Sequence, residues 1–212
     1  RAAVPQMQDA AGTPDHPGVT MEVLQVPGPV GAPPVRVVLY SPRQVTAPCP
    51  ALMHIHGGGY VLGTPEMNHE RNAALANDLR CVVLSVDYRL APETRAPGSV
   101  EDCYAALAWL HAQAAQRGID PTRIAVLGQS AGGGLAPALC LLARDRGEWA
   151  IAMQILIYPV LDDRTGGGPP ADQLLSVRGH DAPGIARAGA LDVDDVVGAV
   201  DGVVGGAAAG DA

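Results

Sequence analysis

The chain has 212 residues, 48% of them hydrophobic and 3% aromatic, and a formal net charge of −8. This length fits one domain with a full hydrophobic core, and an acidic balance without a basic patch argues against a nucleic-acid or anionic-membrane partner. No apolar run reaches the ~20 residues of a membrane span, and the first residues lack the charged and apolar regions of a signal peptide. We therefore expect a cytoplasmic protein with no membrane span.

Short β-rich runs alternate with helical patterns along the chain. We expect strands at residues 21–26, 35–40, 51–55, 81–86 and 124–127 and within 151–158, and helices at 70–79, 99–118 and 130–144. The Pro-rich stretch between the first two strands predicts a hairpin-like pair. The remaining strands alternate with helices, which predicts an α/β fold in which a mostly parallel sheet carries helices on both faces.

Three local features carry specific expectations. Ser99 and Asp102 resemble a weak capping box at the start of the second helix. Pro137 removes one backbone hydrogen bond from the last helix, so we expect a kink or a restart there. The four cysteines are widely spaced and form no C-x-x-C pair, and without a secretory signal they are expected to be free buried thiols.

The segment Gly128-Gln129-Ser130-Ala131-Gly132 joins a predicted strand to a predicted helix. This G-x-S-x-G pattern is typical of a nucleophile elbow, in which a tight turn exposes the serine hydroxyl. The N-terminus of the following helix favours negative charge that develops beside the serine. In a glycine-rich chain the five residues alone would be weak evidence, but their position between a strand and a helix predicts that Ser130 is a nucleophile.

A second glycine motif, His56-Gly57-Gly58-Gly59-Tyr60, follows the strand at 51–55. Its three glycines free the backbone to turn N–H groups toward one point, where they would stabilise the oxyanion of a tetrahedral intermediate. The amide of Ala131 would be a further donor. We expect His56 to brace the loop, because it precedes the nucleophile in the chain, and His54 to be a core histidine. The two motifs together predict acyl transfer by an activated serine.

Two further motifs are Asp87-Tyr88-Arg89-Leu90-Ala91-Pro92-Glu93 and Tyr158-Pro159-Val160-Leu161-Asp162. With the two glycine motifs, in this order, they resemble the hormone-sensitive-lipase-like group of α/β-hydrolases, in its bacterial carboxylesterase branch (family IV). The resemblance covers roughly residues 20 to 165. It implies an α/β-hydrolase fold, a serine carboxylic-ester hydrolase that acts on short-to-medium acyl esters, and neither a cofactor nor a metal.

The resemblance also assigns roles to individual residues. It implies that Ser130 is the nucleophile. The oxyanion hole would be built from Gly57, Gly58, Gly59 and Ala131, with Gly57 setting the loop and the other three donating their amides. The segment at 87–93 would brace the core beside the site.

The acid and the histidine of such a site come later in the family, in the order Ser, Asp or Glu, His, and neither is identifiable in this chain. His180 is the only histidine beyond Ser130 and stands as a candidate base without a preceding strand, while Asp162 and Asp163 are interpreted as structural. Loss of the general base lowers kcat by ~10⁶. We therefore expect this polypeptide to be weakly active or inactive, with the last two strand–helix units of the fold missing.

The chain is accordingly divided into an irregular arm that is a lid remnant (1–18), the N-terminal part of an α/β-hydrolase core (19–165) and a tail (166–212). Gly, Ala, Asp and Val dominate the tail, which has no aromatic residue and is expected to be disordered. The chain contains no Lys and no Phe, whose codons are AT-rich. We hypothesise that the tail is a shifted reading frame of a GC-rich gene or a mis-called end, either of which leaves the hydrolase C-terminally truncated.

Two alternatives remain open at this point. The same apparatus serves amide hydrolases such as deacetylases and small peptidases, and the walls of the pocket that would separate them from esterases are not visible in the sequence. The missing acid and histidine also fit a non-catalytic, truncated α/β-hydrolase-like protein. The expected partner is a small-molecule ester, and a homodimer is left open.

Overall fold

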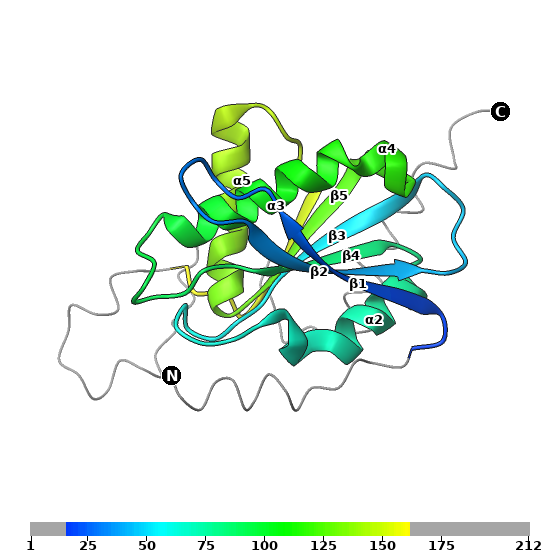
Figure 1. Cartoon of the computed structure of the whole chain (residues 1–212), viewed down its shortest axis with the longest axis horizontal. Coiled ribbons are helices and arrows are strands. Elements are labelled where there is room, and N and C mark those ends of the chain that lie inside the picture. Colours follow the sequence, from blue (N-terminus) through cyan, green and yellow to red (C-terminus); the bar gives the residue numbers. More distant parts are fainter. Residues whose placement is uncertain (1–15, 162–212) are drawn as a thin grey trace, which may run out of the picture.

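The computed structural model describes residues 16–161, in which a six-stranded sheet carries helices on both faces (Figure 1). His180 and the predicted tail lie outside the described residues, as does most of the predicted arm. The elements in chain order are β1 (Val19–Val26), β2 (Val35–Pro42), β3 (Cys49–Ile55), the 3₁₀ helix η1 (Pro65–Asn68), α2 (His69–Asp78), β4 (Val82–Asp87), α3 (Gly98–Ala112), α4 (Ala114–Arg117), β5 (Ile119–Gln129), α5 (Ala131–Arg146) and β6 (Met153–Ile157).

The strands are ordered β1-β2-β4-β3-β5-β6 across the sheet. β1 pairs with β2 and β2 with β4 in antiparallel fashion, whereas β4, β3, β5 and β6 run parallel. The predicted hairpin-like pair and the mostly parallel sheet are therefore confirmed. Ile55 pairs with both Val86 and Gly128, so three parallel strands end side by side. Ligands of open α/β sheets bind outside such carboxyl ends.

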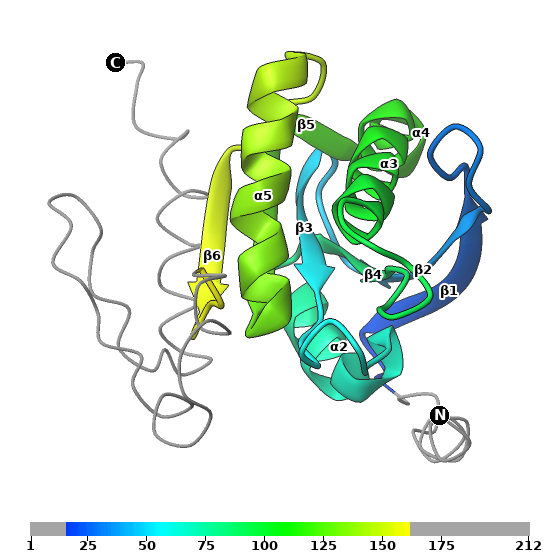
Figure 2. The ribbon, with the colours of Figure 1, turned by 90° about the vertical axis from the view of Figure 1, so that its left-hand side faces the viewer.

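Two apolar clusters cover the two faces of the sheet. α3 and α5 lie side by side over one face, where their leucines pack on inward residues such as Met53 and Leu84 (Figure 2). α2 lies on the opposite face and packs its alanines and Leu75 on Leu52 and Val83 (Figure 1). Successive side chains of a strand point to opposite faces, so β3 and β4 supply both clusters, as expected of strands buried between two helical layers.

The start of α3 differs from the capping-box prediction, which is wrong. The helix begins at Gly98 without any side-chain cap. Ser99 instead donates its hydroxyl hydrogen to the carbonyl of Arg89 at 2.7 Å, and Asp102 accepts hydrogen bonds from the backbone and the guanidinium of Arg89. Both side chains therefore secure the loop after β4, and the buried Asp102 carboxylate gains charge-assisted hydrogen bonds from the Arg89 guanidinium.

α5 runs unbroken from Ala131 to Arg146 with Pro137 inside it, so a restart at this proline is not observed. Leu135 and Leu139 are buried against the sheet on either side of it, and this packing outweighs the one missing backbone bond. The four cysteines are free thiols, three of them buried. Among the described residues, no helix combines the length and apolar character that a bilayer crossing requires.

Candidate active site

Ser130 occupies the turn between β5 and α5, with φ 54° and ψ −115°. Non-glycine residues rarely adopt such a positive φ, and strained residues of this kind cluster at functional sites. The backbone around it is held on both sides: its N–H donates to the carbonyl of Ile157 at 2.9 Å, and its carbonyl accepts from Gly134 at 3.1 Å and Val160 at 3.2 Å. The surrounding structure thus maintains the strained turn.

Close backbone approach explains the glycines that flank Ser130. A Cβ at Gly128 would lie 2.2 Å from the carbonyl oxygen of Gly132, and a Cβ at Gly132 would lie 2.0 Å from that of Ile55. Any side chain at either position would displace backbone. The two glycines therefore allow the first turn of α5 to sit directly on the ends of β3 and β5.

The loop at residues 56–63, here called the glycine loop, lies against this turn. A Cβ at Gly57 would be 3.1 Å from the carbonyl oxygen of Gln129 and 3.4 Å from Cβ of Ser130. The structure thus brings together the two glycine motifs that are 74 positions apart in the sequence, counted from His56 to Ser130. Gly58 has φ 123° and Gly59 has φ 61°, so the bend uses conformations that favour glycine.

Three backbone amides remain available at this junction. Within residues 16–161, the N–H groups of Gly58, Gly59 and Ala131 donate no backbone hydrogen bond. Ala131 is the first residue of α5, where intrahelical acceptors are lacking and the helix dipole favours negative charge. These are the amides that the sequence predicts as oxyanion donors.

His56 is buried at the base of the glycine loop, with 1% of its surface exposed. Its Nδ1 lies 2.7 Å from the carbonyl oxygen of Gly57, and its ring stacks on that of Tyr88 with centroids 4.3 Å apart. The Tyr88 hydroxyl donates to the carbonyl of His56 at 2.9 Å. Burial lowers the pKa of His56, which keeps the imidazole neutral, with Nδ1–H as the donor to Gly57.

His54 is fully buried on the α2 face of the sheet. Its Nδ1 lies 2.9 Å from the hydroxyl of Ser85 and 3.3 Å from the amide nitrogen of Asn72, and burial lowers its pKa to about 3. The prediction that His54 is a core histidine is therefore confirmed.

The two further motifs of the resemblance contact the two glycine motifs. The amide of Ala91, in the 87–93 segment, donates to the carbonyl of Tyr60 at 2.8 Å. In the Tyr-Pro motif, the backbone of Val160 bonds to Ser130, and Pro159 packs so closely on α5 that a Cβ at Gly133 would lie 2.8 Å from its Cα. All four motifs thus converge on one end of the sheet.

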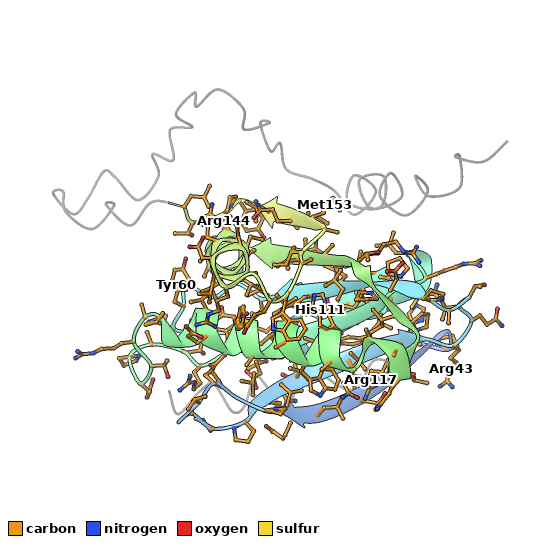
Figure 3. The ribbon with its side chains drawn as sticks, turned by 90° about the horizontal axis from the view of Figure 1, so that it is seen from above. Arg43, Tyr60, His111, Arg117, Arg144 and Met153 are labelled. Atoms are coloured by element: carbon orange, nitrogen blue, oxygen red, sulfur yellow. The ribbon has the colours of Figure 1, made fainter. Side chains whose placement is uncertain are left out.

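Tyr60 is a site residue whose importance the sequence does not reveal. It adopts φ 64°. Its hydroxyl oxygen lies so close to α5 that a Cβ at Gly134 would be only 2.3 Å from it. The tyrosine therefore extends from the glycine loop to the first turn of α5, at the end of the molecule seen at the left of Figure 3. Residue type alone gives no sign of a positive φ in a tyrosine, so no sequence signal could have identified this contact.

The acid and the base of the site are not identified among residues 16–161. Among residues 16–161, no side chain forms a hydrogen bond with the Ser130 hydroxyl, and the candidate base His180 lies outside the described residues. Within the same part of the chain, no group of three or more His, Cys, Asp or Glu side chains could hold a metal ion.

Comparison with known families shows which family the chain belongs to. A family model described as the alpha/beta hydrolase fold matches residues 52–181, which contain both glycine motifs. The chain belongs to this family. The α/β-hydrolase fold and the resemblance to its carboxylesterases, both expected from the sequence, are confirmed.

Several named relatives of the chain are esterases. The carboxylesterase NlhH of Mycobacterium tuberculosis is 44% identical over 126 residues, which cover 59% of this chain and 39% of NlhH. An arylesterase of Saccharolobus solfataricus is 42% identical over 126 residues, with 59% and 40% covered.

Solved structures give the same result. A bacterial heroin esterase is similar with a TM-score of 0.71 and 46% identity, over 77% of this chain and 51% of that chain. The thermophilic carboxylesterase EstE1, cloned from a metagenomic library, has a TM-score of 0.68 and 39% identity, over 76% and 54%. The chain therefore spans about half the length of these solved relatives and about 40% of the length of NlhH and the arylesterase.

Proposed function

We propose that the chain carries the nucleophile and the oxyanion hole of a serine carboxylic-ester hydrolase. In this proposal Ser130 Oγ attacks the ester carbonyl carbon, and the carbonyl π electrons move onto oxygen. The amides of Gly58, Gly59 and Ala131 hold that oxyanion, and each well-placed donor is worth ~2.7–4 kcal/mol in the transition state. Collapse of the intermediate expels the alcohol, and water then hydrolyses the acyl-enzyme.

One observation carries the proposal: the glycine loop touches the turn at Ser130 while three neighbouring amides have no backbone acceptor within residues 16–161. Carboxylesterases and an arylesterase among the relatives favour esters over amides as substrates. Short-to-medium acyl esters remain the proposed substrate class. The roles of Ser130, Gly57, Gly58, Gly59 and Ala131 are the roles that we expected from the sequence.

Turnover requires a general base that takes the proton from Oγ and returns it to the alcohol. None of the described histidines is hydrogen-bonded to Ser130, so a base would have to come from beyond residues 16–161. The oxyanion hole and binding alone still give ~10³–10⁴-fold acceleration over water. We propose slow acylation of Ser130 as the property of this 212-residue chain.

Covalent labelling tests the proposal on the chain itself. An alkyl fluorophosphonate reacts when a serine oxygen attacks phosphorus and fluoride leaves, and intact-mass spectrometry counts the adducts. We expect one adduct on the wild type, one on Ser41→Ala, whose serine lies in β2 away from the site, and none on Ser130→Ala. Labelling of Ser130→Ala at the wild-type rate would refute the assignment. With p-nitrophenyl butyrate as substrate, Ser130→Ala should lose whatever acyl transfer the wild type shows.

A further inference from the structure

Arg36 is the second residue of β2, a strand whose other residues are mostly apolar. It pairs with Asp87 of β4 across the antiparallel ladder. Its side chain lies on the α2 face, where one guanidinium nitrogen contacts the carboxylate of Glu66 and the other lies 3.2 Å from Asp87 Oδ2. The side chains of Arg36, Glu66 and Asp87 are 31%, 13% and 29% exposed. One half-buried cation therefore joins two half-buried carboxylates.

The two carboxylates lie next to the two ends of the glycine loop. Glu66 lies in η1, which begins two residues after the loop ends at Gly63. Asp87 directly precedes Tyr88, whose hydroxyl and ring hold His56, the first residue of the loop. Arg36 thus connects the segment that leaves the loop to the segment that supports its beginning.

The charges make this connection dependent on the arginine. Arg36 and local hydrogen bonds lower the pKa of Glu66 despite its burial, whereas burial raises the pKa of Asp87 and Glu66 adds to that increase. Without the guanidinium, two like charges would face each other in a partly desolvated site. Their repulsion would push η1 away from the end of β4. The C-terminal end of the glycine loop would then no longer be held in place.

We propose that Arg36 is a positioning residue for the oxyanion hole, acting through Glu66 and Asp87 on the glycine loop. The proposal rests on the proposed function of that loop. Arg36 touches neither Ser130 nor the three amides; it fixes the direction in which the loop presents them. A donor held by a bridged ion pair is preorganised before the substrate binds, which is where electrostatic catalysis gains most.

The test compares Arg36→Met, Glu66→Ala and Glu66→Gln with the wild type and a control. Glu66→Ala removes the connection to the loop but leaves the Arg36–Asp87 pair intact, so it should fold even if Arg36→Met does not. Glu66→Gln keeps an oxygen that can accept from Arg36. The control is Arg117→Met, which breaks the Arg117–Glu22 pair (3.1 Å) at the opposite end of the molecule from Tyr60 (Figure 3).

Amide hydrogen exchange gives the first readout. We expect Glu66→Ala and Arg36→Met to exchange at least tenfold faster in peptides from residues 56–66, with unchanged rates in α5. Glu66→Gln and Arg117→Met should behave as the wild type does. Equal loop exchange in Glu66→Ala and Arg117→Met would overturn the inference.

The rate of fluorophosphonate labelling gives the second readout. A misplaced oxyanion hole lowers the maximal inactivation rate constant, whereas a merely structural defect lowers the fraction of molecules that label. We expect about a tenfold lower rate constant for Glu66→Ala at full labelling, against the 10²–10³ that loss of a whole donor costs, with recovery in Glu66→Gln. An unchanged rate constant in Glu66→Ala would overturn the positioning role. A wild type that takes no label would refute the proposed function, while hydrogen exchange would still decide whether Arg36 anchors the loop.

Discussion

Buried histidines give the molecule a definite response to acid. His54 has a pKa of about 3 in the folded chain because burial disfavours its charged form, and burial also lowers the pKa of His56 and His69. In the unfolded chain a histidine titrates near 6.5. Below that pH the unfolded state therefore binds more protons than the folded state does. The free energy of unfolding falls as pH decreases from 6.5 toward 3.

We predict that His54→Gln flattens this dependence. One proton contributes up to ~1.4 kcal/mol per pH unit, so between pH 7 and pH 5 the wild type should lose about 2 kcal/mol more than the variant. Urea unfolding at both pH values measures the difference. The control is His111→Gln, whose partly exposed ring stacks on Trp149 and contacts the carbonyl of Ala150; it should keep the wild-type slope. Equal slopes for wild type and His54→Gln would contradict the prediction.

A second residue-scale prediction concerns the ion pair between Asp102 and Arg89. The Asp102 side chain is fully buried and accepts from the Arg89 guanidinium at 2.7 Å. Removal of one partner of a buried pair typically costs 3–5 kcal/mol. Since Arg89 is one-third exposed, we expect Asp102→Ala to cost about 3 kcal/mol in urea unfolding. Asp145→Ala, which breaks an exposed pair with Arg144, should cost less than about 0.5 kcal/mol.

At the scale of elements, the close packing of α5 on the end of β3 depends on the absence of a side chain at Gly132. A glycine in a helix interior is normally destabilising by roughly 0.5–1 kcal/mol relative to alanine. At Gly132 the sign should reverse, because the new Cβ would lie 2.0 Å from the carbonyl oxygen of Ile55, and backbone yields poorly. We predict that Gly132→Ala destabilises by about 2 kcal/mol and slows labelling of Ser130.

Thermal unfolding and the labelling rate measure both effects. Ala138→Gly, at an exposed position of the same helix, is the comparison and should lower stability by only about 1 kcal/mol without slowing labelling. A Gly132→Ala variant that is more stable than the wild type would show that α5 can move away from the strands.

Elements with a strong apolar period could be predicted from the sequence. The β-branched run at 81–86 appears as β4, shifted by one residue, because both of its faces are buried. The expected strand at 124–127 is instead a longer β5 that begins at Ile119, with an irregular register opposite Cys49. The turn predicted at Asp120-Pro121 is present as a local interruption of β5: Asp120 accepts from the amide of Thr122, two residues on, and the pairing with β3 passes from Ile119 directly to Ile124.

The candidate site could be predicted only in its backbone parts. Ser130 and the three glycines each belong to a short contiguous motif that can be recognised in the sequence, because tight turns require particular residue types. Arg36, Glu66 and Asp87 lie far apart in the sequence, and only the strand order β2-β4-β3 brings them together. An arginine within the apolar run of β2 indicates a buried charged partner, but the sequence does not show which residue that partner is.

At the scale of the whole molecule, the described residues form a unit in which the strand ends, the glycine loop and the first turn of α5 meet at one edge of the sheet. The chain matches about half the length of its solved relatives, and that half holds the elbow and the glycine loop. We propose that formation of the oxyanion hole depends on these residues alone, whereas proton transfer depends on residues beyond them. Binding of a tetrahedral anion and rapid turnover are then separable properties.

The most direct measurement is a crystal structure of the chain after reaction with a fluorophosphonate. The tetrahedral phosphorus stands in for the carbon of the intermediate, and its free oxygen stands in for the oxyanion. The account predicts a bond from Ser130 Oγ to phosphorus, with that oxygen about 2.7–3.1 Å from the nitrogens of Gly58, Gly59 and Ala131. A phosphonyl oxygen turned toward solvent, or an adduct on any other residue, would contradict it.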